Sequence, residues 1–376
     1  MENLNYALFG LGTIAKNHLL SIKSIPVIYN DCNFKVNLNS LYTTHKEDKE
    51  TLGKLIGFQK VVDKIDDIEN DSSIDVIDIC TPNYLHFEQV LDSVQHEKNV
   101  YCEKPLTANV YDAAALLSKL ENVKAKTQVA LVLRFLPAVA QAHAIIKSGV
   151  IGKVKSFHFE MLHTGYLNPS RRISWRLEKA KSGGGAIVDL GIHLIDLSRF
   201  LIGDVERVSA FVGTTVASRK LENSEKLQKV DVDDWGYVMV TASNDVKGFI
   251  EVSRVAVGNE GTRLFVYCTE GSIKIDLASP YNAVIFDLNG KQLYIDDKVF
   301  LGDDYFCEVK KLYPDPKVSM GSMVDLHYTG LLWFFKSILQ NTVPAGTPTF
   351  QEAYKDQLVV EAIYKSAANN GELTEV

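Results

Sequence analysis

The chain has 376 residues, of which 46% are hydrophobic and 23% are charged, and its formal net charge is −7. This length and composition are typical of a folded protein of about two domains and exclude broad disorder. No long basic stretch indicates a nucleic-acid partner, and no apolar run reaches the roughly 18 residues of a membrane-spanning helix.

The first residues and the cysteines bear on the cellular compartment. The opening segment MENLNYALFGLG lacks the basic and apolar regions of a secretion signal. The five cysteines are odd in number and include no C-x-x-C pair, so neither a disulfide framework nor a cysteine zinc site is predicted. We therefore expect a cytoplasmic protein, and we expect no metal site.

The first third of the sequence predicts strands that alternate with helices. The predicted strands are 5–9, 34–42, 74–80 and 99–102, and the predicted helices are 14–25, 46–55 and 84–96. Such alternation is typical of βαβ units on a parallel sheet, so we predict a doubly wound domain over residues 1–128. Polar residues in the second strand (Lys35, Asn37, Asn39) place it nearer a sheet edge or against a polar neighbour.

The remaining residues predict an α+β domain over 129–376 with a large, mostly antiparallel, open sheet. Predicted helices lie at 137–148, 324–340 and 350–369, and predicted strands at 155–161, 207–216, 236–241, 249–255, 264–268 and 272–277. Short polar turns between strands, such as that at 243–245, favour antiparallel hairpins.

The segment Gly10-Leu11-Gly12-Thr13-Ile14-Ala15 has the pattern G-x-G-x-x-A between the first strand and the first helix. Glycines permit a tight turn and a close approach of the backbone to a pyrophosphate, whose charge the helix start attracts. We predict that Gly10, Gly12, Thr13 and Ile14 bind the phosphates of a dinucleotide. The alternative is a glycine-rich turn without a ligand, because the motif alone is a weak signal.

The end of the second predicted strand bears on the choice between NAD and NADP. The tip reads Tyr42-Thr43-Thr44-His45-Lys46, with no carboxylate before Glu47. The hydroxyls of Thr43 and Thr44 with Lys46 tolerate a 2′-phosphate better than an acidic residue, which leans towards NADP or loose discrimination. The alternative is that Lys46 is a solvated lysine at a helix start.

Two later segments follow predicted strands, and in such sheets ligands bind outside the carboxyl ends of the strands. The first holds Thr81, Pro82, Asn83 and His86, and the second is Cys102-Glu103-Lys104-Pro105-Leu106. Both are therefore expected to line a cofactor crevice.

A glycine run at 183–185 precedes an apolar helix with three polar residues, Asp189, His193 and Asp196, spaced i, i+4 and i+7. Their spacing places them on one face of the helix, and buried charges there need a partner or a site. Three interpretations are open: Asp189 and His193 are catalytic while Asp196 is structural, all three form a structural network, or they bind a metal.

These four motifs, in this order, closely resemble the glucose–fructose oxidoreductase / inositol dehydrogenase (Gfo/Idh/MocA) family over nearly the whole chain. The segment Ser174-Trp175-Arg176 matches its longer sugar dehydrogenases. The resemblance implies that Lys104, Asp189 and His193 are catalytic. It also implies that the cofactor is bound by the residues Thr81, Pro82, Asn83, His86, Glu103, Trp175 and Arg176.

The resemblance suggests a reaction. We expect His193 to take a hydroxyl proton as hydride leaves, Asp189 to orient the imidazole, and Lys104 to stabilise the alkoxide or share the proton. Which of Lys104 and His193 is the base stays open. Candidates for contacts with a polyhydroxylated substrate are His163, Tyr166, Arg172 and His327.

The expected function is that of an NAD(P)-dependent oxidoreductase acting on a secondary alcohol or ketone of a sugar, sugar derivative or inositol. Two alternatives are a glycoside hydrolase that acts by transient oxidation with NAD, and a non-catalytic sensor of the cofactor. The intact Lys104, Asp189 and His193 argue against the sensor. Family members cover the sheet of the second domain by pairing, which predicts a homodimer or homotetramer.

Overall fold

The computed structural model describes residues 1–121 and 123–376. The chain forms two compact units. Unit 1 comprises Met1–Thr107, Tyr111–Val132 and Leu312–Gln351, and unit 2 comprises Ala108–Val110, Leu133–Lys311 and Glu352–Val376. The sequence predicted two consecutive segments, whereas these compact units interleave along the chain because residues near the C-terminus return to unit 1.

A six-stranded parallel sheet with the strand order β3-β2-β1-β4-β5-β6 forms the centre of unit 1. Its strands are β1 (Glu2–Phe9), β2 (Phe34–Tyr42), β3 (Lys60–Val62), β4 (Val76–Ile79), β5 (Asn99–Cys102) and β6 (Thr127–Val129). This order is that of a Rossmann fold and confirms the predicted doubly wound domain. β2 lies next to the edge strand β3, and Asn37 on β2 donates to Asn5 on β1 at 3.2 Å, as its polar residues indicated.

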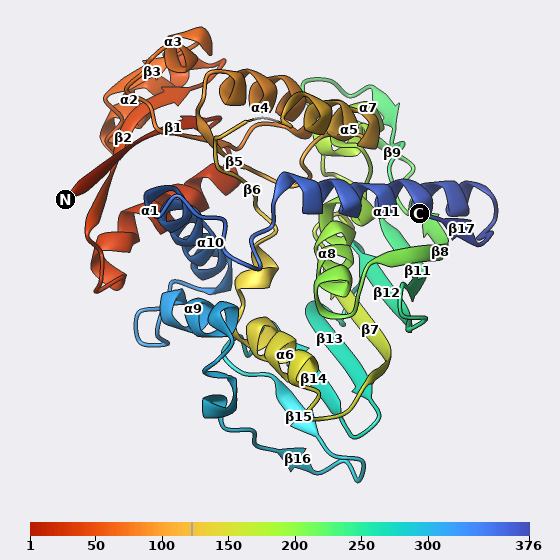
Figure 1. Ribbon diagram of the computed structural model, residues 1–376. Helices are drawn as coiled ribbons and strands as arrows, with labels where there is room; N and C mark the ends of the chain where they lie inside the picture. The colour runs from red at the N-terminus through yellow and green to blue at the C-terminus, as the bar shows by residue number, and fades with distance from the viewer. Residues whose placement is uncertain (122) are drawn as a thin grey trace. The chain divides into compact units, whose positions relative to one another are not determined.

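Helix α10 explains why the late segment belongs to unit 1. The unit's helices are α1 (Thr13–Ile28), α2 (Lys46–Ile56), α3 (Asp66–Glu69), α4 (His86–Gln95), α5 (Val110–Lys119) and α10 (Ser322–Leu339). α1 and α10 lie side by side (Figure 1). Phe335 of α10 packs edge-on against Tyr6 of β1, and Phe334 packs against Tyr101 of β5. Burying each such side chain contributes about 1.5–3 kcal/mol, which favours this return over an exposed helix.

Unit 2 contains a nine-stranded sheet with the order β16-β15-β14-β13-β7-β12-β11-β8-β17. Its strands are β7 (Val154–Leu162), β8 (Val205–Gly213), β11 (Trp235–Ala242), β12 (Lys247–Ser253), β13 (Gly261–Cys268), β14 (Ser272–Asp276), β15 (Val284–Phe286), β16 (Gln292–Leu293) and β17 (Thr374–Glu375). β12 and β7 are parallel, and the other neighbouring pairs are antiparallel. The predicted large, mostly antiparallel sheet is therefore confirmed. A separate hairpin pairs β9 (Ser218–Lys220) with β10 (Leu227–Lys229).

The two faces of the nine-stranded sheet differ in character. One face buries alternate apolar residues, such as Phe159 on β7, and contacts helices α6 (Pro137–Ser148) and α8 (Ile192–Leu201). The other face, here called the open sheet face, carries large side chains that are about half exposed. They are Phe211 (54%), Tyr237 (44%), Met239 (52%) and Tyr267 (45%).

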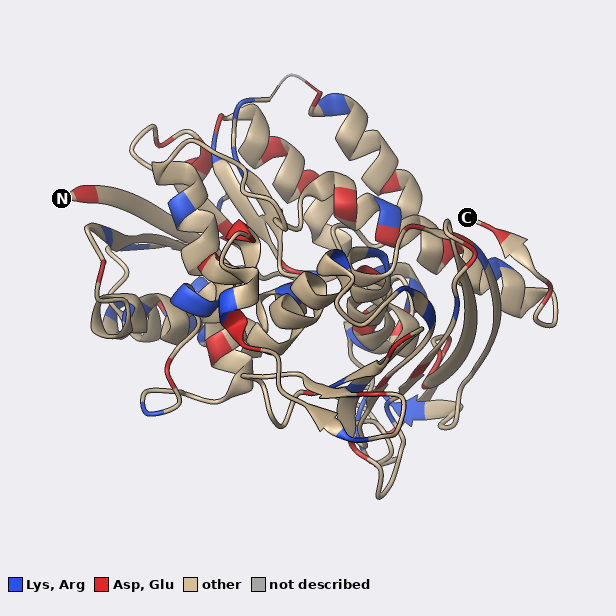
Figure 2. Ribbon diagram, turned by 60° about the horizontal axis from the view of Figure 1, so that its bottom comes forward, with Lys and Arg blue, Asp and Glu red and all other residues tan. Residues whose placement is uncertain are grey.

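The other helices of unit 2 are short, apart from the last. They are α7 (Lys179–Ser182), α9 (Asp304–Leu312) and α11 (Phe350–Ala368). No helix in the described part of the chain is both long and apolar enough to cross a bilayer. Figure 2 shows Lys and Arg interspersed with Asp and Glu over the ribbon, in keeping with the small net charge.

Candidate active site

The glycine turn after β1 is fixed by contacts with two neighbouring strands. Gly10 has a φ of +86°, and a Cβ there would lie 3.1 Å from the carbonyl oxygen of Cys80. Its N–H donates to the carbonyl of Tyr42 at 2.9 Å. Only glycine adopts this backbone conformation without strain, so the turn requires Gly10.

The start of α1 fits a phosphate group. Gly12 is the N-cap of this helix and provides no side-chain cap, and no acidic residue lies in the first turn. A Cβ at Gly12 would meet no atom within 4 Å, so open space lies in front of the first turn, where Thr13 is also exposed. Free N–H groups at a helix start attract anions. Residues Gly10 to Ile14 therefore fit the pyrophosphate of a dinucleotide.

The tip after β2 separates the roles of its two threonines. Thr43 is buried, its N–H donates to the carbonyl of Val62 at 3.0 Å, and its hydroxyl oxygen accepts from the N–H of His45 at 3.2 Å. Thr44 and His45 are exposed, and α2 begins at Lys46. Thr43 thus shapes the turn, and Thr44 is the more exposed of the two threonines predicted to contact the ribose.

His86 joins the two later segments of unit 1. Its ring is fully buried, with Nδ1 2.9 Å from the carbonyl of Pro105 and Nε2 3.0 Å from that of Thr81. Burial lowers the pKa of His86, although the two carbonyls oppose this effect. The structure therefore gives His86 a part in holding the turns together. The hydroxyl of Thr81 in turn donates to Gln89.

The turn from Tyr101 to Thr107 exposes one side chain in particular. Lys104 is the only residue from 101 to 107 that is not buried. The peptide bond between Lys104 and Pro105 is cis.

The carboxylate of Glu103 accepts the N–H of Lys104 at 3.2 Å, and its other oxygen lies 3.2 Å from Nε2 of His18. Burial would raise the pKa of Glu103, but the hydrogen bond from His18 and the charges of His327, His18 and Lys104 lower it to about 2.

In unit 2, the glycine run before the predicted catalytic helix allows a close approach of neighbouring chain segments. A Cβ at Gly185 would lie 1.8 Å from the carbonyl oxygen of Asp233. The carboxylate of Asp233 accepts the N–H groups of Gly185 and Ile187, at 2.9 and 2.8 Å, and the hydroxyl of Tyr364 at 2.6 Å. Asp233 therefore fixes the start of this helix, a role that the sequence analysis missed because the residue is 48 positions away from Gly185.

The helix does not have the regular geometry that the sequence predicted. Residues Ile187–Gly191 form a π-helical turn that continues into α8. Such turns are frequent at functional sites. From residue 186 to residue 199, only Asp189 and His193 are not buried. These two side chains are therefore the ones in the segment that are open to a ligand.

Asp196 differs from its two neighbours. It is 1% exposed, and Nε of Arg134 lies 2.9 Å from both of its carboxylate oxygens. A bidentate arginine pair of this kind is a strong and geometrically specific contact. This contact agrees with the structural role that two of the three interpretations gave to Asp196.

Two arginines lie beside Asp189. Nη1 of Arg176 is 3.9 Å from one carboxylate oxygen, and Nη1 of Arg254 is 4.0 Å from the other. The guanidinium of Arg176 also stacks over the ring of Trp175 at 4.4 Å, within the short helical turn Trp175–Leu177. The carboxylate of Asp189 thus lies close to two cations.

Sequence reasoning missed Arg254. It directly follows β12, is 1% exposed, and donates from Nη2 to the carbonyl of Asp233 at 2.8 Å. Its buried Nε has no hydrogen-bond partner among the described residues. The signal was a lone arginine at the end of a strand, which sequence alone does not distinguish from a surface residue.

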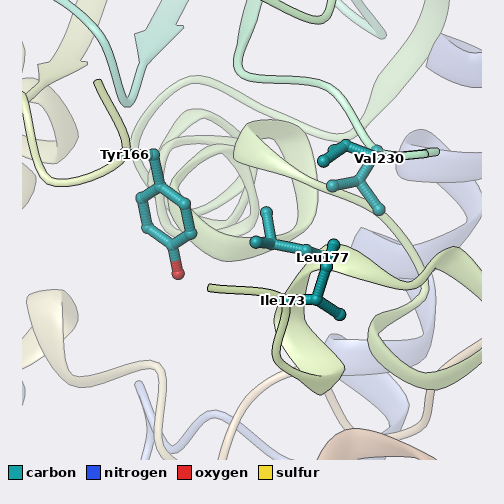
Figure 3. Packing of buried hydrophobic residues seen from close by; sticks show 5 residues of the cluster. Tyr166, Ile173, Leu177 and Val230 are labelled. Carbon is teal, nitrogen blue, oxygen red and sulfur yellow. The ribbon is translucent and has the colours of Figure 1, made fainter. Parts of the chain in front are cut away.

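The four predicted substrate residues divide into two groups. Tyr166 and His163 belong to unit 2, near Asp189. The ring of Tyr166 lies between the guanidinium groups of Arg171 and Arg254, each at 4.0 Å, and packs with the cluster shown in Figure 3. Burial lowers the pKa of His163, while the charge of Asp189 opposes that shift.

Arg172 and His327 are instead engaged by the protein. Arg172 donates to the carbonyls of Leu221 and Ser224 and pairs with Glu225, so it ties down the turn between β9 and β10. His327 is 3% exposed within unit 1, and its ring lies 4.5 Å from that of His18. The substrate role expected for both residues stays a prediction.

Comparisons with known proteins agree with this geometry. A family model described as "Oxidoreductase family, NAD-binding Rossmann fold" matches residues 4–131, and one described as "GFO/IDH/MocA C-terminal domain" matches residues 139–274. The chain is 28% identical to levoglucosan dehydrogenase of Pseudarthrobacter phenanthrenivorans, over 98% of this chain and 97% of that protein. A relative with another reaction is 2,7-anhydro-N-acetylneuraminate hydratase of Escherichia coli, which is 29% identical over 41% of this chain and 40% of that protein.

A solved structure supports the same assignment. Levoglucosan dehydrogenase in complex with NADH and levoglucosan superposes with a TM-score of 0.89 at 27% identity, covering 100% of this chain and 99% of that chain. The predicted family and the predicted nicotinamide cofactor are therefore confirmed. The chain belongs to the GFO/IDH/MocA family of oxidoreductases and contains its NAD-binding Rossmann domain.

Proposed function

We propose that this protein is a dehydrogenase that oxidises a secondary alcohol of a sugar, sugar derivative or inositol with NAD or NADP. The observation that carries the proposal is the selective exposure of three polar residues. Lys104 is the one open side chain in its turn, and Asp189 and His193 are the two open side chains of a buried helix. A titratable side chain that stays accessible within an otherwise buried element can reach a substrate, so these three residues are candidates for catalytic roles.

The nicotinamide, when bound, accepts the hydride from the substrate carbon. In the proposed reaction, His193 accepts the proton of the substrate hydroxyl, because an ordinary imidazole titrates near neutral pH. Asp189 orients that imidazole, and Arg176 and Arg254 lie beside its carboxylate. Lys104 stabilises the alkoxide that precedes the carbonyl product. The alcohol thus loses a hydride and a proton, and a carbon–oxygen double bond forms.

The assignment of the base to His193 rather than Lys104 is part of this proposal, and so is the action of both residues on one substrate. Because the two residues belong to different units, kinetics is the direct test. A common role predicts that Lys104→Met and His193→Gln each reduce the turnover number, and that the double variant loses less than the product of the two effects.

The cofactor preference follows from the tip after β2. The exposed Thr44 and the adjacent Lys46 present a hydroxyl and a cation, and no carboxylate lies in this segment before Glu47. A carboxylate at this position repels the 2′-phosphate of NADP. We therefore propose that the enzyme uses NAD and also tolerates NADP. The ratio of kcat/KM for the two cofactors measures this preference.

The open sheet face supports a homodimer or homotetramer. Phe211 and Tyr237 are register partners on adjacent strands, and Met239 extends the same patch along β11. Contiguous exposed apolar groups of this kind mark interaction sites in soluble proteins. A second copy of the chain offers the same apolar patch. The five cysteines are all free thiols, which fits the cytoplasmic location that we also propose.

A substrate screen tests the main proposal. Sugars, sugar acids and inositols are incubated with the protein and NAD or NADP, and absorbance at about 340 nm reports reduced cofactor. A dehydrogenase forms reduced cofactor in a one-to-one ratio with oxidised product. Glycoside hydrolysis by transient oxidation converts substrate with no net reduced cofactor. The same holds for a hydration, which is the reaction that the name of the Escherichia coli relative indicates. That result would replace the dehydrogenase with one of these reactions.

A further inference from the structure

A buried chain of charged groups lies beneath the Lys104 turn in unit 1. His18 on α1 is 0% exposed, and its two ring nitrogens face two different carboxylates. Nδ1 lies 2.8 Å from Asp78 on β4, and Nε2 lies 3.2 Å from Glu103, which directly follows β5. The imidazole therefore bridges three elements of the Rossmann fold.

This geometry determines the protonation state of His18. A carboxylate only accepts hydrogen bonds, so an imidazole that bonds to a carboxylate through each nitrogen must carry a proton on both. Asp78 is fully buried and also accepts the hydroxyl of Tyr6 at 2.5 Å. Buried carboxylates of this kind are costly unless they are paired and hydrogen-bonded, and a doubly protonated His18 supplies both requirements.

The other groups around the His18 ring do not provide an alternative acceptor of comparable strength. The side chains of Asp78, Glu103, Cys80, Tyr101 and His327 face it, with the Cys80 sulfur 3.3 Å from Nδ1, the Tyr101 ring at 5.6 Å and the His327 ring at 4.5 Å. Burial raises the pKa of the Cys80 thiol, which therefore stays neutral. His18 is the cation that lies in contact with both carboxylates.

The chain continues from Glu103 to the proposed catalytic lysine. One carboxylate oxygen of Glu103 faces His18, and the other accepts the backbone N–H of Lys104 at 3.2 Å. The backbone N–H of Glu103 donates to the carbonyl of Ile79 at the end of β4. The position of the Lys104 backbone thus depends on a carboxylate that His18 holds in place.

We propose that His18 is a positioning residue of the active site that, held as an imidazolium by Asp78, fixes the Glu103 carboxylate and, through it, the backbone of Lys104. The same helix begins at the glycine turn that fits the phosphates, so α1 links the cofactor turn to the catalytic turn. This inference rests on the proposed role of Lys104. It assigns no proton transfer to His18, whose two protons stay in place during turnover.

A double-mutant cycle tests the proposal with His18→Asn, Glu103→Gln and the combined variant. Asparagine replaces the cation with a neutral group, so Glu103 loses its charged partner. A displacement of about 1 Å at a catalytic group costs about 100-fold in rate, and we expect this loss in kcat for His18→Asn. In the Glu103→Gln background, the same substitution should change kcat by no more than about twofold. The reason is that His18 acts on Lys104 through the Glu103 carboxylate, which this background already lacks.

A matched control is His143→Asn. His143 lies in unit 2 and stacks on Phe200 with ring centroids 4.7 Å apart, so the substitution removes a packed imidazole elsewhere in the protein. We expect its kcat to equal that of the wild type. If the losses from His18→Asn and Glu103→Gln multiply, or if His18→Asn lowers only the melting temperature, the proposal is wrong.

A second measurement does not require the substrate. Nitrogen-15 NMR of histidine-labelled protein identifies the His18 signals by their loss in His18→Asn. We expect both ring nitrogens to be protonated at about pH 8, well above the ordinary histidine pKa of about 6.5. A neutral ring at this pH overturns the proposal, and so does a metal ion held by His18, Glu103 and His327, because a metal needs a deprotonated ligand. Failure of the substrate screen with a doubly protonated His18 would count against the proposed function instead.

Discussion

The guanidinium of Arg254 lies beside the carboxylate of Asp189, with Nη1 4.0 Å from Oδ2, and Arg254 itself is buried. Its other terminal nitrogen donates to the backbone carbonyl of Asp233, the residue whose carboxylate fixes the start of the Asp189 helix. One arginine thus contacts both the acidic side chain of the proposed site and the segment that positions it.

The first prediction concerns this arginine. Arg254→Lys keeps the charge but loses the planar fork and the stacking on Tyr166, so Asp189 should move relative to His193. We expect kcat to fall by about tenfold to 100-fold, as for a displaced catalytic group. Arg263→Lys is a matched control, because Arg263 pairs with Glu160 on the sheet. A kcat for Arg254→Lys within about twofold of that of the wild type would contradict the positioning role.

The second prediction concerns the proposed base. His193→Gln should reduce kcat by about 10²- to 10⁴-fold, the usual contribution of general base catalysis. The affinity for NADH, measured by fluorescence titration, should remain unchanged, since the turn expected to hold the cofactor phosphates belongs to unit 1. His158→Gln serves as the control, because His158 lies on β7 of the nine-stranded sheet, where its ring packs with Phe249 and Phe265. Near-normal turnover in both His193→Gln and Lys104→Met would refute the catalytic assignment.

The third prediction separates stability from cofactor binding at a single position. Gly12→Asp places a carboxylate at the N-cap of α1, where a Cβ meets no atom within 4 Å. Aspartate caps helices well, so the free protein should be as stable as the wild type or more stable, by up to about 1 kcal/mol. The same charge repels the pyrophosphate, and the affinity for NADH should fall. Gly302→Asp, also in open space, should leave the affinity unchanged, and an unaltered Gly12→Asp affinity would place the phosphates elsewhere.

The fourth prediction concerns the pH dependence of stability. Burial and the nearby charge of Asp92 raise the pKa of Glu69 to about 7. The pKa of Glu69 in the folded state therefore exceeds its value of about 4.3 in the unfolded chain. The neutral carboxyl thus contributes stability that is fully present below about pH 4.3 and is lost as the pH rises through about 7. Urea unfolding at about pH 5 and pH 8 measures this loss. Glu69→Gln should show a smaller difference between the two pH values, and an equal difference would contradict the assignment.

The fifth prediction concerns the open sheet face. Tyr237→Glu introduces a charge at the centre of the patch formed with Phe211 and Met239, and it should dissociate the proposed oligomer. Light scattering should then give the mass of one chain, 41.9 kDa. Leu227→Glu is the control, because Leu227 is 61% exposed on the separate β9–β10 hairpin. A monomeric wild-type protein would contradict the proposal directly.

Local patterns predicted most of the fold. The alternation of strands and helices identified the parallel sheet, and the glycine pattern at 10–12 marked the turn that the structure bends through a positive φ. β3 and β6 were missed because each has only three residues, too few to show a period. The return of α10 to unit 1 was also missed, because an apolar helix does not indicate which core it joins.

The candidate site was predicted less completely, for a physical reason. Lys104, Asp189 and His193 lie within short motifs, whereas Arg254 and Asp233 reach the site across many residues of intervening chain. The π-helical turn at Ile187–Gly191 begins where the N–H of Ile187 donates to the carboxylate of Asp233, and side-chain spacing reveals neither feature. Sequence motifs thus identified the residues proposed to react, and the fold identified Arg254 and Asp233, which contact the segment that carries two of them.

The hydroxyl of Tyr364 on α11 donates to the carboxylate of Asp233 and accepts the N–H of Gly185, so α11 helps to position the start of the Asp189 helix. The family match to the C-terminal domain ends at residue 274, well before this tyrosine. A chain shortened to residue 274 would retain Lys104, Asp189 and His193 and yet lose these two hydrogen bonds. Residues beyond the matched boundary therefore contribute to the position of the Asp189 helix, although no motif residue lies there.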